Sequence, residues 1–304
     1  MTRAEGRFTE AAMRAALREI CQEHGLSAEE ATLLRLTNNA VFLLPLHDLV
    51  VRIARTGALL PRVAKVARLA AWFEQVGAPT IRLAARFLSQ PVSAGHSLAT
   101  IWQYLPPAQA SLTTVDLGLA LCRFHALGVP PFELPAWDPV GDARRRLGDA
   151  EGLDDADREY LLDWCDRLDP LLAEFAGRRD DLGLIHGDAH VGNLLRTPAG
   201  EAVLCDFDAT AVGPVLVDLA AVAVGDARFA RSQYQQLHST YGRDVTADPS
   251  WPILEQAREL KMIAAAVPLL ASGPGVREEF AVRLRSVREH DDAAQWTPFA
   301  QLRA

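Results

Sequence analysis

The sequence predicts an α+β protein in two parts, with strands and one long helix in the N-terminal third and mainly helices in the remainder. Short apolar runs bounded by Gly, Pro and Asp recur before residue 105, whereas apolar residues at helical spacing dominate after residue 112. The pair Pro106-Pro107 separates these regions and marks a linker at 103–107. With 304 residues, 49% of them hydrophobic, the chain can bury the core of one two-lobed domain or of two domains.

The N-terminal part begins with an amphipathic helix over 9–24, for which Thr9 is the predicted N-cap and Gly25 the end. Turn residues at Asn38-Asn39 and His47-Asp48 divide the next segment into three strands, and a long helix follows over 59–76. The predicted strands are Leu33–Thr37, Val41–Leu44 and Leu49–Ala54, and after the long helix Thr80–Leu88 and Leu98–Tyr104.

The C-terminal part has a different pattern, in which apolar residues recur every three or four positions. An extended connector at 130–139 interrupts this pattern. The predicted helices cover 112–127, 154–176, 227–241, 250–271 and 275–290.

Between these helices, three short apolar runs at 182–185, 193–195 and 202–205 predict buried strands. Asp188, Asn193 and Asp206 lie at the edges of these runs. A carboxylate in apolar surroundings must pair with a cation or coordinate a metal. Carboxylate and amide oxygens suit Mg²⁺, which proteins hold with one or two carboxylates together with substrate phosphates.

The pattern His-x-Asp-x-x-x-x-Asn over 186–193, followed by a hairpin and Asp-Phe-Asp at 206–208, resembles the aminoglycoside phosphotransferase family, a small-molecule branch of the protein-kinase-like fold. The resemblance extends from about Leu33 to about Lys261 and implies a two-lobed architecture. The small lobe would be residues 1–105, including an extra N-terminal helix, and the catalytic and substrate lobe residues 106–304. It further implies transfer of the γ-phosphoryl group of ATP, or of GTP, to a hydroxyl.

The resemblance also implies roles for individual residues. Asp188 would be the catalytic base, and Asn193 and Asp206 would hold Mg²⁺. The implied supporting residues are Asp208 as an outer partner of the metal, His186 as a brace of the catalytic loop, and Asp218 as a buried structural acid.

The same resemblance predicts a nucleotide site in the N-terminal part. Asn38 and Asn39 occupy the turn that is glycine-rich in kinases, and Arg52 stands where kinases have a lysine that contacts phosphates. The backbone of Gln103, Tyr104 and Leu105 would bind adenine. The long helix lacks the expected acid partner for Arg52, because its only acid, Glu74, lies in the last turn.

The acceptor is predicted to be a small molecule. Asp206 and Asp218 are too close in sequence for an activation loop between them, and no Ala-Pro-Glu segment follows. A net charge of −8 favours a cationic acceptor such as an aminoglycoside, hence antibiotic resistance, with a metabolite kinase of choline, homoserine or sugar-amine type as the alternative. The candidate acceptor-binding acids are Asp226, Glu255 and Glu259.

Two other function classes remain open. A catalytically weak nucleotide-binding pseudokinase would explain the glycine-free turn and the missing helix acid. A metal hydrolase would use His186, Asp188 and His190 as ligands, although no second histidine cluster supports it.

Composition limits partner and location. The negative charge argues against nucleic-acid binding, and the longest apolar runs are shorter than the roughly 20 residues of a membrane span. Four widely spaced cysteines and an N-terminus without an apolar signal region predict a cytoplasmic protein with reduced thiols. A monomer or a homodimer is expected.

Overall fold

The computed structural model describes residues 8–36, 39–87, 89–107, 110–148, 150, 152–177 and 181–302. These residues divide into two compact units. The first unit contains the described residues of Met1–Leu112 together with Asn193–Asp208, and the second contains those of Thr113–Gly192 together with Ala209–Ala304. The first unit therefore takes a segment from the middle of the C-terminal half of the chain.

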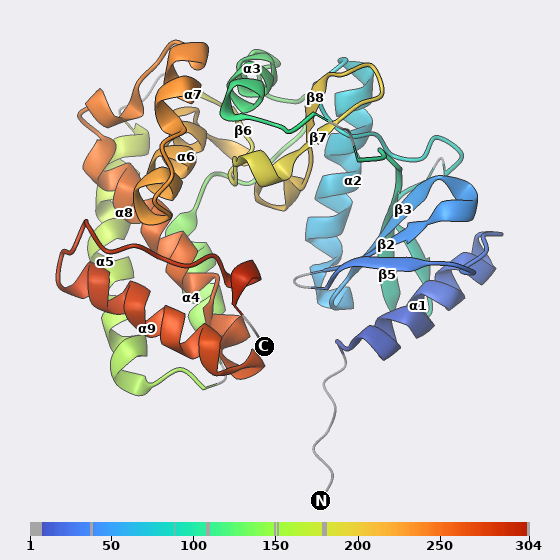
Figure 1. Ribbon diagram of the computed structural model, residues 1–304, viewed down its shortest axis with the longest axis horizontal. Coiled ribbons are helices and arrows are strands. Elements are labelled where there is room, and N and C mark those ends of the chain that lie inside the picture. The colour runs from blue at the N-terminus through green and yellow to red at the C-terminus, as the bar shows by residue number, and fades with distance from the viewer. Residues whose placement is uncertain are drawn as a thin grey trace, which may run out of the picture. The chain divides into compact units, whose positions relative to one another are not determined.

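The described residues of the first unit form a five-stranded antiparallel sheet with strand order β1-β2-β3-β5-β4 (Figure 1). The turn predicted at His47-Asp48 connects β2 and β3, and Asp48 adopts the left-handed backbone conformation there. The strands are β1 Thr32–Leu36, β2 Asn39–Leu44, β3 Leu49–Ala54, β4 Val92–Ala94 and β5 Ser97–Gln103.

Two helices pack on this sheet. Helix α1, Glu10–Glu23, is capped by the Thr9 hydroxyl, which accepts a hydrogen bond from the Ala12 amide at 3.2 Å. Its apolar side chains share a core with alternate residues of the sheet, including Phe42 and Ile101. Helix α2, Leu60–Gln75, packs on the other side (Figure 1). The sheet face toward α2 is the one that carries Arg52 and Trp102.

The predicted strand over Thr80–Leu88 is wrong: the described part of this segment forms only isolated bridges, and the strand beside β5 is Val92–Ala94. The Ile81 amide donates to the Leu204 carbonyl at 3.0 Å, whereas the Ala84 amide donates to the Ile101 carbonyl at 2.9 Å. Because the segment divides its hydrogen bonds between two partners, it cannot continue a single ladder.

The two strands predicted at 193–195 and 202–205 are confirmed as the hairpin of β7, Leu194–Arg196, and β8, Ala202–Leu204. The Leu204 amide donates to the Pro79 carbonyl at 2.8 Å, and its own carbonyl accepts from Ile81. These bonds attach the hairpin to the first unit, although its sequence follows the predicted catalytic loop.

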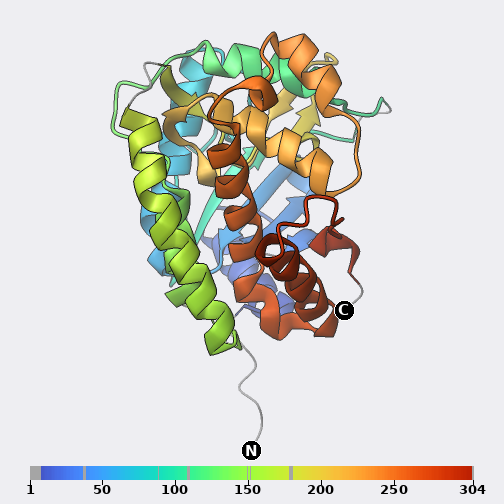
Figure 2. The same ribbon diagram turned by 90° about the vertical axis from the view of Figure 1, so that its left-hand side faces the viewer.

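The second unit is mainly helical, with α8 packed among α4, α5, α6 and α9 (Figure 2). Its helices are α3 Thr114–His125, α4 Pro139–Gly148, α5 Asp155–Gly177, α6 Leu216–Arg228, α7 Tyr234–Tyr241, α8 Trp251–Ala264 and α9 Pro274–Arg288. Strand β6, Leu182–Ile185, pairs antiparallel with β9, Ala211–Pro214. No helix in the described part of the chain has both the length and the apolar character needed to cross a membrane.

The sequence analysis missed α4 and β9. Three arginines and a Pro-Val-Gly-Asp start leave α4 with few apolar positions from which to recognise a helix. The β9 sequence Ala-Val-Gly-Pro is typical of a turn. Gly213 is required in this strand, since a β-carbon there would lie 2.7 Å from the Trp137 β-carbon.

Candidate active site

The predicted catalytic loop leaves β6 at His186, and a buried carboxylate fixes its conformation. Asp218, in the first turn of α6, accepts hydrogen bonds from the amides of His186 and Gly187, both at 2.7 Å. Gly187 has φ 78°, and a β-carbon there would clash with the Ala209 carbonyl. The turn therefore needs glycine at 187 and a carboxylate at 218.

Asp218 is fully buried and has a side-chain partner from α3. His125 Nε2 lies 3.0 Å from its carboxylate, and His125 Nδ1 shares a 2.7 Å hydrogen bond with the Tyr241 hydroxyl. Burial acts to raise the pKa of Asp218, but the hydrogen bond and charge of His125, together with those of His186, outweigh burial and hold it below its ordinary value. Asp218 is thus an anionic anchor for the loop.

Asp188, the predicted base, directly follows the two residues whose amides Asp218 binds, His186 and Gly187. Its amide donates to His186 Nδ1 at 3.3 Å, so the histidine supports the loop from within. Its carboxylate Oδ1 lies 2.7 Å from Arg258 Nη1 and 3.7 Å from Lys261 Nζ. Burial acts to raise the pKa of Asp188, but the charges of Lys261 and Arg258 hold it well below its usual range. Asp188 is therefore ionised at neutral pH.

The sequence analysis did not identify Arg258 and Lys261 as site residues. A single arginine or lysine on an amphipathic helix is usually a solvated residue. Their three-residue spacing, which places both on one face of α8, was the only available signal.

In the first unit, the β7–β8 hairpin holds Asn193 and Asp206 at one end. The Cys205 amide donates to the Asn193 carbonyl at 2.9 Å, which places residue 206 beside the start of β7. Asp206 has φ 66° in the left-handed region. Phe207, which follows it, is buried with its ring centroid 5.0 Å from that of Phe73. The aromatic side chain therefore fixes the position of the two aspartates around it.

Arg52 of β3 takes its acidic partners from this hairpin end. Its Nη2 lies 2.6 Å from Asp208 Oδ2 and 3.4 Å from Asp206 Oδ1. The long helix supplies a cation instead of an acid, because Lys65 Nζ donates to the Asp208 carbonyl at 2.8 Å. Glu74 is exposed in the last turn of α2. The acid that the sequence analysis sought on the helix thus comes from the Asp-Phe-Asp segment.

The other predicted nucleotide-binding residues also lie in the first unit, except Asn38, which falls outside the described residues. Asn39 is nearly buried, and its Nδ2 donates to Asp208 Oδ2 at 3.4 Å. The Gln103 amide donates to the Arg82 carbonyl and the Tyr104 amide to the Asp48 carbonyl, both at 3.0 Å.

Comparison with known proteins bears on this arrangement. A model of the phosphotransferase enzyme family matches residues 25–259. The chain belongs to this family. As predicted, the protein is therefore a phosphotransferase with a hydroxyl acceptor.

Solved structures of small-molecule kinases share the phosphotransferase's fold. The aminoglycoside phosphotransferase APH(3'')-Id from Streptomyces rimosus is 17% identical, covers 82% of this chain and 98% of its own, and has a TM-score of 0.60. The choline kinase LicA from Streptococcus pneumoniae is 15% identical, covers 90% of this chain and 99% of its own, and has a TM-score of 0.62. A microcompartment-associated aminopropanol kinase is 21% identical, covers 95% of this chain and 100% of its own, and has a TM-score of 0.66. These matches confirm the predicted kinase-like α+β fold, while no curated protein matches the sequence.

Of the three acids predicted to bind a cationic acceptor, Asp226 and Glu259 have partners within the phosphotransferase's second unit. Asp226 accepts hydrogen bonds from the Gln233 and Tyr234 amides at the start of α7. Glu259 is buried and accepts from Arg228 Nε at 2.6 Å. Burial, together with the charges of Glu259 and Asp292, raises the pKa of Glu255 to about 7. Asp226 and Glu259 are thus bound by groups of the protein itself, and a role of these acids in acceptor binding stays a prediction.

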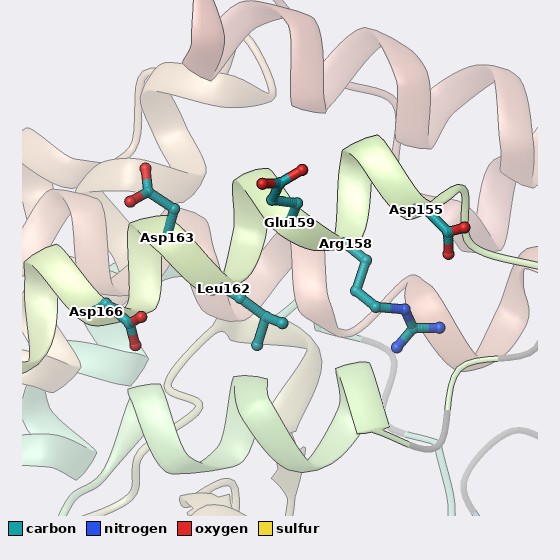
Figure 3. A pocket seen from close by; sticks show the side chains of 6 residues that line it. All are labelled: Asp155, Arg158, Glu159, Leu162, Asp163 and Asp166. Atoms are coloured by element: carbon teal, nitrogen blue, oxygen red, sulfur yellow. The ribbon is translucent and has the colours of Figure 1, made fainter.

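An acidic depression lies on the outer face of α5, lined by Asp155, Arg158, Glu159, Leu162, Asp163 and Asp166 (Figure 3). Arginines already pair with two of these acids: Arg144 with Asp166 at 2.8 Å, and Arg167 with Asp163. The depression is thus a solvated, locally neutralised helix face, and we assign it no substrate.

Proposed function

We propose that this phosphotransferase transfers the γ-phosphoryl group of ATP to a hydroxyl of a small molecule. The proposal rests mainly on the end of the β7–β8 hairpin, where Asp206 and Asp208 form ion pairs with Arg52 beside the start of β7. A phosphate-contacting cation and oxygen donors for a divalent metal are the parts that phosphoryl transfer requires. Within the described residues, no group of three His, Cys, Asp or Glu could hold a metal, so the hydrolase alternative has no support.

Asp188 would orient the acceptor hydroxyl and take its proton. Its lowered pKa makes it a weak base, which suits a transition state in which alignment matters more than proton abstraction. Asp218 and His186 would keep the carboxylate in place through the loop backbone.

The donor set at the hairpin end fits Mg²⁺, because Asn193 and Asp206 offer an amide and a carboxylate oxygen. When bound, the ion would neutralise charge on the nucleotide phosphates. Arg52, held by Asp208, would contact the same phosphates.

Adenine would bind at the end of β5. The Gln103 and Tyr104 amides already donate within the first unit, and residues 106 and 107 are prolines without an amide hydrogen. Leu105 is therefore the residue to which we assign the amide donor for adenine. The choice of ATP over GTP rests on the family resemblance.

The acceptor named by the sequence analysis was cationic, such as an aminoglycoside, with a choline-, homoserine- or sugar-amine-type metabolite as the alternative. The related structures carry names of aminoglycoside, choline and aminopropanol kinases. Asp226 is bound by the Gln233 amide and Glu259 by Arg228, so neither acid is available to an aminoglycoside with several positive charges. This favours the metabolite alternative.

Asp188→Asn tests the proposed base. We expect the rate of transfer to fall by about 10²–10⁴-fold while ATP binding is retained, because the amide keeps the shape of the side chain but cannot accept the proton. The measurement is phosphate-adduct formation by mass spectrometry in a panel of hydroxyl compounds with ATP and Mg²⁺. Asp163→Asn, on the exposed face of α5, is the matched control. Unchanged transfer in Asp188→Asn would refute the assignment, and nucleotide binding without any transfer in the wild type would favour the pseudokinase.

A further inference from the structure

Helix α8 presents two cations to the proposed catalytic base. Arg258 Nη1 lies 2.7 Å from Asp188 Oδ1, and Lys261 Nζ lies 3.7 Å from the same oxygen while donating to the Gly187 carbonyl. Both side chains are largely buried, with 14% and 24% of their surface exposed. These are costly places for positive charge unless an anion compensates them.

One edge of the Arg258 guanidinium is not used by Asp188. Its Nε is buried and has no hydrogen-bond partner within the described structure. A guanidinium can bind a carboxylate through two parallel hydrogen bonds, so an edge with a buried, unsatisfied Nε–H is a typical position for an anionic ligand.

Arg258 also lines a small cavity in the second unit. Its wall includes Arg258, Lys261 and Gly187, together with the apolar side chains of Val217, Ala221 and Leu254.

The local charges do not balance without a further anion. Asp188 supplies one negative charge against the two positive charges of Arg258 and Lys261. Of the other acids that influence Lys261, Asp142 is paired with Arg145, and Asp218 is bound by the loop amides and His125. Burial outweighs these acids and lowers the pKa of Lys261, so the two cations lack enough negative charge around them, and a bound anion would supply it.

We propose that the acceptor carries a carboxylate, and this inference rests on the proposed function. Arg258 and Lys261 bind the carboxylate while the acceptor hydroxyl faces Asp188. The hydroxyl proton passes to the Asp188 carboxylate, a bond forms between the hydroxyl oxygen and the γ-phosphorus, and the bond from that phosphorus to the bridging oxygen of ADP breaks. The products are a phosphorylated hydroxy acid and ADP.

Matched acceptors test this proposal directly. Homoserine and 3-aminopropan-1-ol differ by one carboxylate, and 4-hydroxybutyrate keeps the carboxylate but lacks the amine. Choline and kanamycin represent cationic acceptors. Each compound is assayed with ATP and Mg²⁺ for its phosphate adduct, and its binding to the protein is measured by calorimetry. We expect the carboxylate-bearing compounds to bind and react in preference to 3-aminopropan-1-ol.

Arg258→Gln and Lys261→Met locate the effect. Each should raise KM, or the dissociation constant, for the carboxylate compounds by about ten- to a hundredfold, as expected for a lost hydrogen bond to a charged group. Because both cations also contact Asp188, turnover of every acceptor should fall, and the diagnostic quantity is the ratio of the KM for homoserine to the KM for 3-aminopropan-1-ol, which should rise by about tenfold or more. Arg285→Gln, at an exposed position of α9, is the control.

Two results would overturn the inference: equal or better use of 3-aminopropan-1-ol, choline or kanamycin, or carboxylate compounds that bind wild type no better than Arg258→Gln. Failure of the proposed function looks different, because then ATP with Mg²⁺ would neither bind nor transfer phosphate to any compound.

Discussion

Asp218 determines the shape of the proposed catalytic loop by binding its backbone. Its two oxygens serve two backbone amides and one histidine. A fully buried carboxylate of this kind is stable only while all of these partners remain, because an unpaired buried charge is costly.

Asp218→Asn should destabilise the protein by about 2–4 kcal/mol, because the amide cannot accept from both loop amides and loses the charge paired with His125. Urea unfolding at pH 7 measures the change, with Asp163→Asn as the surface control. Transfer activity should fall as well, since Gly187 and His186 lose their anchor. A free energy of unfolding within about 0.5 kcal/mol of wild type would contradict this role.

At the residue scale, the motif positions were predictable and their partners were not. Asp188, Asn193, Asp206 and Asp218 could be selected because local spacing along the chain identifies them. Arg258 is 70 residues from Asp188 in sequence, and only the packing of α8 brings it to the loop.

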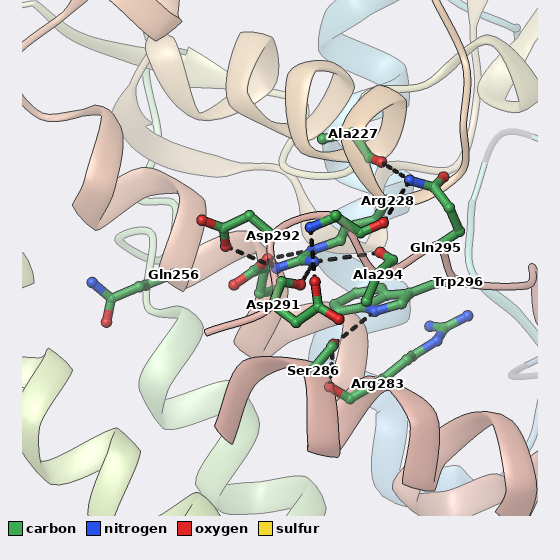
Figure 4. Close-up of polar contacts among 12 residues, drawn as sticks. Ala227, Arg228, Gln256, Arg283, Ser286, Asp291, Asp292, Ala294, Gln295 and Trp296 are labelled. Atoms are coloured by element: carbon green, nitrogen blue, oxygen red, sulfur yellow. Dashed lines mark hydrogen bonds and ion pairs between the residues drawn. The ribbon is translucent and has the colours of Figure 1, made fainter. Parts of the chain in front are cut away.

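Among the helices, α8 has two charged faces, and each one contacts a different part of the second unit. Arg258 and Lys261 face the catalytic loop, whereas Glu259 faces Arg228 of α6. Figure 4 shows the surroundings of Arg228, where its Nη1 donates to the Asp291 carbonyl at 2.7 Å.

The same cluster attaches the segment after α9. The Trp296 amide donates to the Arg228 carbonyl at 2.6 Å, and the Trp296 indole donates to the Ser286 hydroxyl at 3.0 Å (Figure 4). The indole is buried, with the Arg228 guanidinium 5.0 Å from its ring centroid. The last described segment thus connects α6 to α9.

Glu255 makes the stability of this helical cluster depend on pH. Its folded-state pKa of about 7 lies above the ordinary 4.5, so between these values the folded protein binds more protons than the unfolded chain. Stability should therefore fall as pH rises from 4.5 to 7. Glu255→Gln should raise the melting temperature by a few degrees at pH 8 and change it little at pH 4. An equal effect at both pH values would show that Glu255 does not titrate in this range.

The strands and helices with strong periodicity were predictable, among them α1, α2 and the β7–β8 hairpin. The errors fall where backbone hydrogen bonds to distant segments decide the outcome. Residues 80–84 look like a strand by composition but divide their bonds between Leu204 and Ile101. The strand β9 looks like a turn and is held by pairing with β6.

At the scale of the whole molecule, the chain enters its first unit twice. Residues up to 112 build the sheet, and 193–208 return to it with the proposed metal-binding residues. The fold class was predictable from motif and pattern, but this return was not, because the boundary was placed at a single linker near residue 105.

Asp206→Asn should abolish most of the thermal stabilisation by ATP with Mg²⁺, because ligand binding to the folded state raises the melting temperature and the variant loses the carboxylate proposed to hold the ion. Differential scanning fluorimetry with and without EDTA measures the effect. Asp163→Asn should respond as wild type does. A full response of Asp206→Asn, still reversed by EDTA, would place the metal on other ligands.

Because residues 193–208 belong to the first unit, this unit cannot be produced by a simple truncation of the chain. A fragment cut after Leu112 would contain Arg52 but lack Asp208, the carboxylate 2.6 Å from its guanidinium. It would also lack β8, and with it the hydrogen bond that the Leu204 amide donates to Pro79 and the one that the Leu204 carbonyl accepts from Ile81. A minimal nucleotide-binding piece would need residues 193–208 grafted behind residue 112, so a simple truncation should yield an incomplete and poorly folded product.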